Sequence, residues 1–209
     1  MAEQVQHSSE VTRSEPHSAL AMKVILVVAG IVGAVSTFIL VMERLALYTD
    51  PQHKTSCDIS PFISCGSVMA SWQAKLFGFP NQFIGIVAFT IILLTAALFI
   101  SRVVLPRWYW VALYAGTTLG MTMIVWLWYQ SLYSIGALCL YCMAVWSVMI
   151  PLWILMTRYV SAKGYLGGWA ERRLAVFLDG WWWVILIALY AGVLVSIFLR
   201  FDFYWLSLL

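Results

Sequence analysis

Two cysteines, Cys139 and Cys142, lie three positions apart at the start of a long apolar segment. Residues three apart on a helix share one face, with Cβ atoms about 5–6 Å apart, so this pair can open and close a disulfide with little backbone movement. Cys139 falls in the first turn of the helix predicted after Gly136, where free N–H groups and the helix dipole favour a thiolate. A dithiol at the mouth of a membrane helix is open to a protein thiol from the water and to a lipid-soluble oxidant from the bilayer.

A structural role is the alternative for each of the two cysteine pairs. A disulfide across one helical turn closes almost no loop and adds little stability, so the C-x-x-C spacing favours redox function. Cys57 and Cys65 form a C-x7-C loop in a polar stretch, which suits either a structural disulfide or a relay by thiol–disulfide exchange. C-x7-C with a membrane C-x-x-C is not the ligand spacing of a zinc ribbon or finger, so we predict no metal site.

The composition decides what kind of protein must position these thiols. Of the 209 residues, 63% are hydrophobic and 10% are charged, a balance that excludes a soluble domain. Several apolar runs of about twenty residues predict helices rather than a barrel, since a helix satisfies its own backbone in lipid. We predict an all-α integral membrane protein, with a four-helix transmembrane bundle and a fifth transmembrane helix. The predicted spans are residues 22–42, 82–100, 108–129, 138–156 and 181–199.

The segments around the spans divide the chain into parts. Residues 1–21 are polar and without periodicity, which predicts a disordered cytoplasmic tail, and residues 22–157 form the predicted four-helix catalytic domain. Within that domain, residues 43–81 are a long polar loop whose amphipathic stretch 67–77 is too short to span a bilayer, so we predict a half-helix that caps the bundle. The remaining parts are a basic cytoplasmic link (158–180), the fifth helix (181–200) and a short extracytoplasmic tail (201–209).

The lysines and arginines predict the orientation of the bundle. With the N-terminus in the cytoplasm, the cytoplasmic segments carry eight of the 12 basic residues and the opposite side four. This bias puts both cysteine pairs on the extracytoplasmic face of the inner or plasma membrane, where an oxidising compartment supports disulfide chemistry. The basic residues lie between helices and form no nucleic-acid patch, so no nucleic-acid partner is expected. The eight are Arg13, Lys23, Arg102, Arg107, Arg158, Lys163, Arg172 and Arg173, and the four are Arg44, Lys54, Lys75 and Arg200.

Two polar residues, Ser71 and Asn81, lie beside the predicted site. Asn81 follows Gly-Phe-Pro and is well placed to cap the next helix. Capping or surface polarity explains each of these residues as well as contact with a ligand carbonyl does. The aromatic residues Trp126, Trp128 and Tyr129, near the outer end of the third span, fit an interfacial belt or the wall of a ring-binding cavity equally well.

Taken together, these motifs resemble the vitamin K epoxide reductase family, most of all its bacterial, actinobacterial branch. The resemblance rests on C-x7-C, a Ser six positions after Cys65, Asn-x3-Gly from Asn81 to Gly85, and C-x-x-C opening a later helix. It covers about residues 22–157 and implies a four-helix bundle around a quinone, menaquinone or ubiquinone, that accepts electrons.

The resemblance also implies a role for each candidate site residue. The loop cysteines would shuttle electrons, with Cys57 exchanging with a thiol partner and Cys65 exchanging with Cys139. Cys142 would lie nearest the quinone. Two residues match the family's polar positions near the cysteines and the quinone oxygen, namely Ser71 and Asn81.

Two features depart from parts of that family. Vertebrate members carry a Tyr four residues after the second C-x-x-C cysteine, where this chain has Trp146. Some bacterial members continue after the fifth helix into a thioredoxin-like domain, whereas this chain stops at Leu209. The expected thiol partner is therefore a separate extracytoplasmic protein, DsbA-like or thioredoxin-like. We expect a quinone-dependent thiol–disulfide oxidoreductase that supports disulfide-bond formation.

Three other functions fit part of the pattern. A DsbB-type oxidase of unrelated ancestry runs the same overall reaction, but its C-x-x-C comes first in the chain and its spaced pair second. A transporter or metal-handling membrane protein would use the cysteines and the nine methionines as soft ligands. The third is a non-catalytic bundle stapled by two disulfides.

Overall fold

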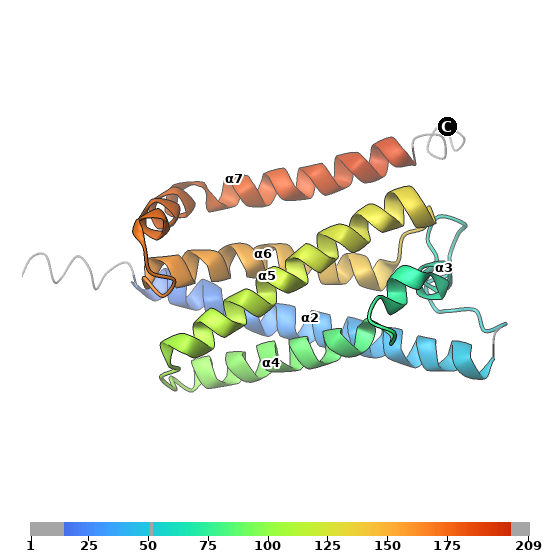
Figure 1. Ribbon diagram of the computed structural model, residues 1–209, viewed down its shortest axis with the longest axis horizontal. Coiled ribbons are helices and arrows are strands. Elements are labelled where there is room, and N and C mark those ends of the chain that lie inside the picture. Colours follow the sequence, from blue (N-terminus) through green and yellow to red (C-terminus); the bar gives the residue numbers. More distant parts are fainter. Residues whose placement is uncertain (1–14, 51, 202–209) are drawn as a thin grey trace, which may run out of the picture.

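The computed structural model describes residues 15–50 and 52–201 as an all-helical protein with five long helices. All five contain segments long and apolar enough to cross a membrane, so the predicted all-α membrane fold is confirmed. Successive long helices run in opposite directions, and the connections therefore alternate between the two ends of the bundle (Figure 1). The helices are α2 (Glu15–Thr49), α4 (Gln82–Ile100), α5 (Arg107–Gln130), α6 (Leu140–Ala162) and α7 (Trp169–Arg200).

Helices α2, α4, α5 and α6 share the main hydrophobic core, as the predicted four-helix bundle requires. Glycines let α2 and α4 approach closely, because a Cβ at Gly33 would collide with the Phe89 ring and one at Gly30 with the Leu93 side chain. Small residues at such contacts are typical of membrane helix packing. The core residues are Met22, Leu26 and Ala29 of α2, Phe89, Ile92 and Ala96 of α4, Trp110 and Leu113 of α5, and Val148, Met149, Leu152, Met156 and Val160 of α6.

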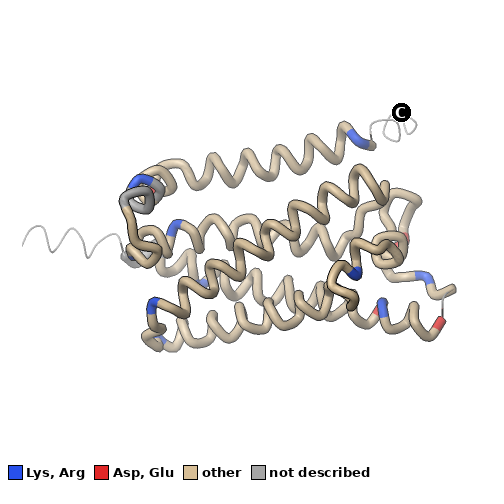
Figure 2. The backbone as a smooth tube through the Cα atoms, in the orientation of Figure 1, with Lys and Arg blue, Asp and Glu red and all other residues tan. Residues whose placement is uncertain are grey.

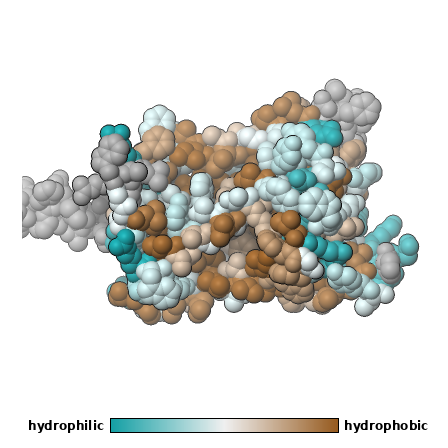
Figure 3. Space-filling model, in the orientation of Figure 1, coloured by the Kyte–Doolittle hydropathy of each residue, from teal (hydrophilic) through white to brown (hydrophobic). Residues whose placement is uncertain are grey.

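The fifth long helix, α7, lies outside this core and packs on α6. Its Trp182, Ile185 and Leu186 contact a smaller cluster that includes Ile150 and Ile154 of α6. Apolar side chains cover much of the middle of the face shown in Figure 3, with the most hydrophilic residues toward the two ends. That distribution fits a bundle whose sides face lipid.

Lysine and arginine lie at the two ends of the bundle and are absent from its middle among the described residues (Figure 2). One end holds the start of α2, the turn between α4 and α5, and the turn between α6 and α7. The other end holds the cysteine loop, the start of α6 and the end of α7. The two cysteine pairs therefore lie at the same end, although which side of a membrane that end faces stays a prediction.

Several element boundaries differ from the sequence-based prediction. α2 begins at Glu15, so residues 15–21, predicted to be disordered, are helical, while residues 1–14 lie outside the described part of the chain. α2 also continues to Thr49, because Glu43 and Arg44 find partners in the following loop and half-helix. α7 starts at Trp169, which makes the predicted link 158–180 largely helical.

The predicted half-helix at 67–77 consists of two shorter pieces, α3 (Cys65–Ala70) and the 3₁₀ turn η1 (Trp72–Lys75). Ser71 separates them, because its backbone is extended, at φ −64° and ψ 155°. The second span, 82–100, agrees with α4 at both ends. Pro151 lies inside α6, as expected for a membrane helix that tolerates proline.

Candidate functional site

Three cysteine sulfurs meet at the loop end of the bundle. Cys57 and Cys65 form a disulfide, with Cα atoms 5.6 Å apart. The Sγ of Cys139 lies 3.1 Å from the Sγ of Cys65, and the sulfurs of these three cysteines all lie within 4.8 Å of one another. Cys139 and Cys142 carry free thiols. The structure thus holds one pair oxidised and the other reduced, in contact through a single sulfur from each.

Two backbone hydrogen bonds set this contact. The N–H of Ser64 donates to the carbonyl of Leu138 at 2.9 Å, and the N–H of Leu138 donates to the carbonyl of Phe62 at 2.7 Å. Ser64 immediately precedes Cys65, and Leu138 immediately precedes Cys139. The short bridge between loop and α6 entry therefore fixes the register in which the two sulfurs face each other.

Cys139 is the N-cap of α6 rather than a residue of its first turn, which corrects the sequence-based placement. The helix starts only at Leu140, because the backbone of Leu138 is bonded to the loop. The Cys139 sulfur accepts a hydrogen bond from the N–H of Cys142 at 3.4 Å. The Cys142 thiol and the backbone N–H groups of Cys142 and Tyr141 lower the pKa of Cys139, and they outweigh burial, which raises it. The lowered pKa has the direction of the predicted preference for a thiolate, and its largest cause is the hydrogen bond from the Cys142 thiol.

Asp58 ties together the segments on either side of the disulfide. Its carboxylate accepts hydrogen bonds from the hydroxyl of Ser64 at 2.7 Å, the N–H of Gly66 at 3.0 Å and the N–H of Thr55 at 3.1 Å. Burial raises the pKa of Asp58, but these hydrogen bonds outweigh it and hold the pKa below the usual range of an aspartate. Sequence reasoning missed this role, and the only signal was an acidic residue directly after Cys57.

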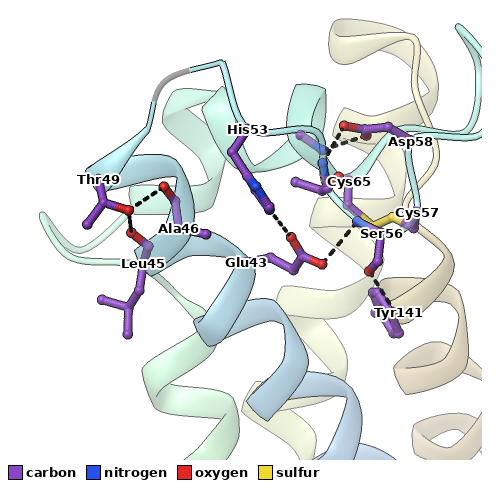
Figure 4. A network of polar contacts seen from close by, with 12 residues as sticks. Glu43, Leu45, Ala46, Thr49, His53, Ser56, Cys57, Asp58, Cys65 and Tyr141 are labelled. Carbon is purple, nitrogen blue, oxygen red and sulfur yellow. Dashed lines mark hydrogen bonds and ion pairs between the residues drawn. A yellow bond between two sulfur atoms is a disulfide. The ribbon is translucent and has the colours of Figure 1, made fainter.

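A second carboxylate, Glu43 near the end of α2, holds the loop just before Cys57 (Figure 4). It accepts hydrogen bonds from the N–H of Ser56 at 3.0 Å and pairs with the Nε2 of His53 at 2.9 Å. The hydroxyl of Ser56 contacts that of Tyr141 on α6 at 3.0 Å. His53 is thus part of this network.

The disulfide is closed to solvent in this arrangement. Cys57 is 2% exposed, and Cys65 and Cys139 are buried with Leu40 and Met69 around them. Arg44 of α2 holds the half-helix in place by donating from Nη1 to the carbonyl of Met69 at 2.7 Å. A protein thiol can reach Cys57 only after part of the loop has moved.

The predicted polar residues Ser71 and Asn81 lie on the half-helix side of the site, and each makes a local hydrogen bond. The hydroxyl of Ser71 donates to the carbonyl of Val68 at 2.7 Å. The side chain of Asn81 makes no capping hydrogen bond to α4, contrary to the capping prediction. Its Nδ2 instead donates to the carbonyl of Gln73 at 2.7 Å, and its Oδ1 is buried without a partner. Asn81 thus joins the start of α4 to the half-helix.

The three aromatic candidates on α5 have different surroundings. Trp126 packs edge-on against Trp72 of the half-helix, with ring centroids 5.9 Å apart. Tyr129 is exposed and packs against Tyr133 with the two rings tilted by 36°. Trp128 packs into the same hydrophobic cluster as Cys142, and its indole Nε1 is buried without a hydrogen-bond partner. Of these three residues, Trp128 alone belongs to a hydrophobic cluster that includes a cysteine.

The chain matches a sequence model described as the vitamin K epoxide reductase family over residues 24–157. The matched segment runs from α2 into α6 and contains all four cysteines. No curated protein matches the chain.

Proposed function

The chain belongs to the vitamin K epoxide reductase family of membrane thiol–disulfide oxidoreductases, and we propose that it reoxidises a DsbA-like extracytoplasmic protein and delivers the electrons to a membrane quinone. Family membership distinguishes it from DsbB-type oxidases of unrelated ancestry. Members of the family work through cysteine pairs, generally with thioredoxin-like proteins and quinones. The finer assignment of partner and electron acceptor is our proposal for this chain.

One observation supports the relay above all others, namely the 3.1 Å separation between the sulfurs of Cys65 and Cys139. A reduced partner gives two electrons to the Cys57–Cys65 disulfide and leaves with its own disulfide formed. The Cys65 thiolate then attacks a Cys139–Cys142 disulfide at Cys139 and releases the Cys142 thiolate. Cys57 attacks Cys65 in turn, which restores the loop disulfide and leaves Cys139 and Cys142 as a dithiol.

The last step returns the α6 pair to its disulfide. Cys139 and Cys142 lose two electrons and two protons, and a quinone that takes up both becomes a quinol. Hydrogen bonds from the thiol and the N–H of Cys142 lower the pKa of Cys139 and so favour its reactive thiolate form. Trp128 offers a buried indole N–H with no partner beside the Cys142 cluster, which suits a carbonyl oxygen as acceptor. The buried Oδ1 of Asn81 suits a hydroxyl donor, such as that of the reduced product.

The partner side requires the loop to open, because Cys57 is buried. Glu43 and Asp58 hold the loop through hydrogen bonds to backbone N–H groups and side chains, and such bonds can be exchanged for water or for a partner's backbone at small net cost. We place this end on the extracytoplasmic side of the cell membrane, on the basis of the lysine and arginine bias.

Quinone reduction measured with purified protein tests the proposal. The purified chain is mixed with a reduced DsbA-like protein and a soluble quinone analogue, and quinone absorbance is followed over time. We expect quinone loss and partner oxidation at one-to-one stoichiometry, with no reaction when the partner is omitted. Partner oxidation without quinone loss, or quinone loss from a Cys139→Ala protein, would contradict it.

One observation favours a second function, since three cysteine sulfurs within 4.8 Å could bind a soft metal ion when all are reduced. A thiolate ligand and a disulfide sulfur are mutually exclusive at Cys57 and Cys65, so the redox and metal functions predict different proteins. Stoichiometric metal in the protein purified under reducing conditions, together with no quinone reduction, would favour the metal-handling function.

A further inference from the structure

The end of α7 departs from the rest of that helix in its surroundings. Phe198 and Leu199 are exposed on the outside of the bundle, at 60% and 66%. Phe201, which directly follows the helix, is only 8% exposed. It caps α7 through its backbone N–H, which donates to the carbonyl of Ile197 at 3.1 Å. A helix that only crosses the membrane has no need to bury an aromatic residue at its end.

Phe201 is buried against the cysteine site. Its ring meets that of Phe62 in the cysteine loop edge to face, with centroids 5.5 Å apart and planes at 75°. It shares one cluster with Leu138 and Trp146, against which Cys142 also packs. Residues from the loop, the entry to α6 and the end of α7 therefore meet in a single apolar cluster.

Arg200 adds a polar anchor beside Phe201. Its Nε donates to the carbonyl of Leu132 at 3.0 Å. Leu132 is fully buried in the same cluster and belongs to the π-helical turn Ser131–Ile135 that ends α5. The end of α7 is thus held at two adjoining residues, Phe201 by ring packing and Arg200 by a hydrogen bond.

The contact with Phe62 bears directly on the two reacting sulfurs. The carbonyl of Phe62 accepts the N–H of Leu138, and Leu138 in turn accepts the N–H of Ser64. These two hydrogen bonds are the ones that set Cys65 opposite Cys139. An aromatic ring packed on Phe62 therefore restrains the loop at the residue whose hydrogen bond to Leu138 aligns the loop with the start of α6.

We propose that the end of α7, which lies beyond the family-matched segment, is a positioning element of the redox site: Phe201, which Arg200 anchors to the end of α5, holds the loop so that Cys65 stays in contact with Cys139. This inference rests on the proposed function, since exchange between these two sulfurs is the step it serves. It assigns to the fifth helix a role besides membrane anchoring.

The test uses a full-length Cys57→Ala/Cys142→Ala protein, which leaves Cys65 and Cys139 as the only cysteines. The purified protein is equilibrated in glutathione redox buffers, and the fraction with a Cys65–Cys139 disulfide is measured by alkylation and mass spectrometry. The resulting equilibrium constant reports how closely the fold holds the two sulfurs together. It needs neither quinone nor partner, so it is independent of turnover.

Adding Phe201→Ala should lower this equilibrium constant about three- to tenfold, the range expected for losing an edge-to-face aromatic pair. For a two-electron couple, tenfold corresponds to about 30 mV. Phe198→Ala removes the same side chain one turn earlier, on the exposed outside of α7, and should leave the constant unchanged. An equal constant in the Phe201→Ala and parent proteins would overturn the proposal.

Two further variants keep the test decisive. Arg200→Met removes the hydrogen bond to Leu132 while keeping most of the side chain's length, and it should lower the constant in the same direction; this variant decides the matter if Phe201→Ala does not fold. Phe62→Ala should make the effect of Phe201→Ala disappear, because the two rings act through each other. If the parent protein forms no Cys65–Cys139 disulfide in any buffer, the proposed relay itself fails.

Discussion

The two cysteine pairs are held in different ways, although one sulfur of each lies in contact with the other. The segment around Cys57 contains no long helix, and side-chain acceptors, chiefly Glu43 and Asp58, hold it through separate polar contacts. Cys139 and Cys142 lie at the entry to a 23-residue membrane helix, one as its cap and the other in its first turn. The loop contacts can break one at a time, whereas moving Cys142 requires unwinding the start of α6.

This difference suits two kinds of reaction partner. A folded thiol protein can react only with an extended segment that moves away from the bundle and exposes its cysteine sulfur to that protein. A small ring in the bilayer needs a fixed dithiol beside a dry pocket. We therefore expect substitutions in the loop to change exchange with the protein partner, and substitutions near α6 or α4 to change quinone reduction.

Removing one cysteine from each pair should give the largest effect. Cys57→Ala should abolish oxidation of the protein partner and yet spare reoxidation of Cys139 and Cys142 by quinone. Cys142→Ala should abolish quinone reduction. Single-turnover reactions that start from the reduced protein and quinone separate the two, because they bypass the partner. Normal quinone turnover in Cys142→Ala would show that the Cys139/Cys142 pair is not the one that reduces the quinone.

Asn81→Ala should have the next largest effect, confined to the quinone side. The free atom of Asn81 is the acceptor Oδ1, because its Nδ2 already donates to Gln73. Losing one buried hydrogen bond costs up to about 1.5 kcal/mol, so we expect about tenfold slower quinone reduction. Ser71→Ala should show a weaker form of the same change, since its hydroxyl is bonded to Val68. A lowered melting temperature with unchanged turnover would instead show that Asn81 only joins α4 to the half-helix.

Asp58→Asn should act chiefly on the loop side, although removing the Asp58 charge also removes an influence that raises the pKa of Cys139. The amide accepts hydrogen bonds less strongly than the carboxylate, so the loop should open more readily and the reduced partner should reduce the Cys57–Cys65 disulfide about two- to tenfold faster. Stopped-flow mixing with the partner measures that rate. Asp50→Asn is the matched control, because Asp50 lies in the same connection and its carboxylate accepts one hydrogen bond from the described residues, from the N–H of Gln52. If both substitutions accelerate reduction of the disulfide equally, the Asp58 carboxylate has no specific role in holding the loop.

The pH dependence of the same rate sharpens this prediction. Because hydrogen bonds lower the pKa of Asp58 in the folded protein, its contribution to loop stability is present above the ordinary aspartate pKa and is lost as pH falls through the lowered value. The ratio of the Asp58→Asn rate to the wild-type rate should therefore begin to fall below about pH 4 and should approach one only below the lowered pKa of Asp58. A ratio that is constant with pH would show that the charge of Asp58 has no part in holding the loop.

Much of this fold followed from the sequence, because each membrane span is a local apolar run. The second span, residues 82–100, was predicted with the observed limits. The location of both cysteine pairs at one end also followed, since two spans separate the loop from the entry to α6. Local patterns sufficed for these features, and no knowledge of packing between distant segments was needed.

The remaining features depend on contacts between distant segments. Cys139 caps α6 because Leu138 pairs with Phe62 and Ser64, more than 70 positions earlier in the chain. The roles of Glu43 and Asp58 depend on backbone N–H groups that only the folded loop brings near them. The contact of Phe201 with Phe62 joins residues 139 positions apart in the chain, and no periodicity could have indicated it.

The central claim is that electrons cross between the pairs through Cys65 and Cys139. The most direct test is peptide mapping of a Cys142→Ala protein, quenched in acid and alkylated without reduction. Without Cys142 to compete for it, the Cys139 thiolate can attack Cys65, so we expect peptides that join Cys65 to Cys139 with Cys57 alkylated. If only the Cys57–Cys65 peptide is found, with Cys139 alkylated throughout, the two pairs do not exchange and the relay is contradicted.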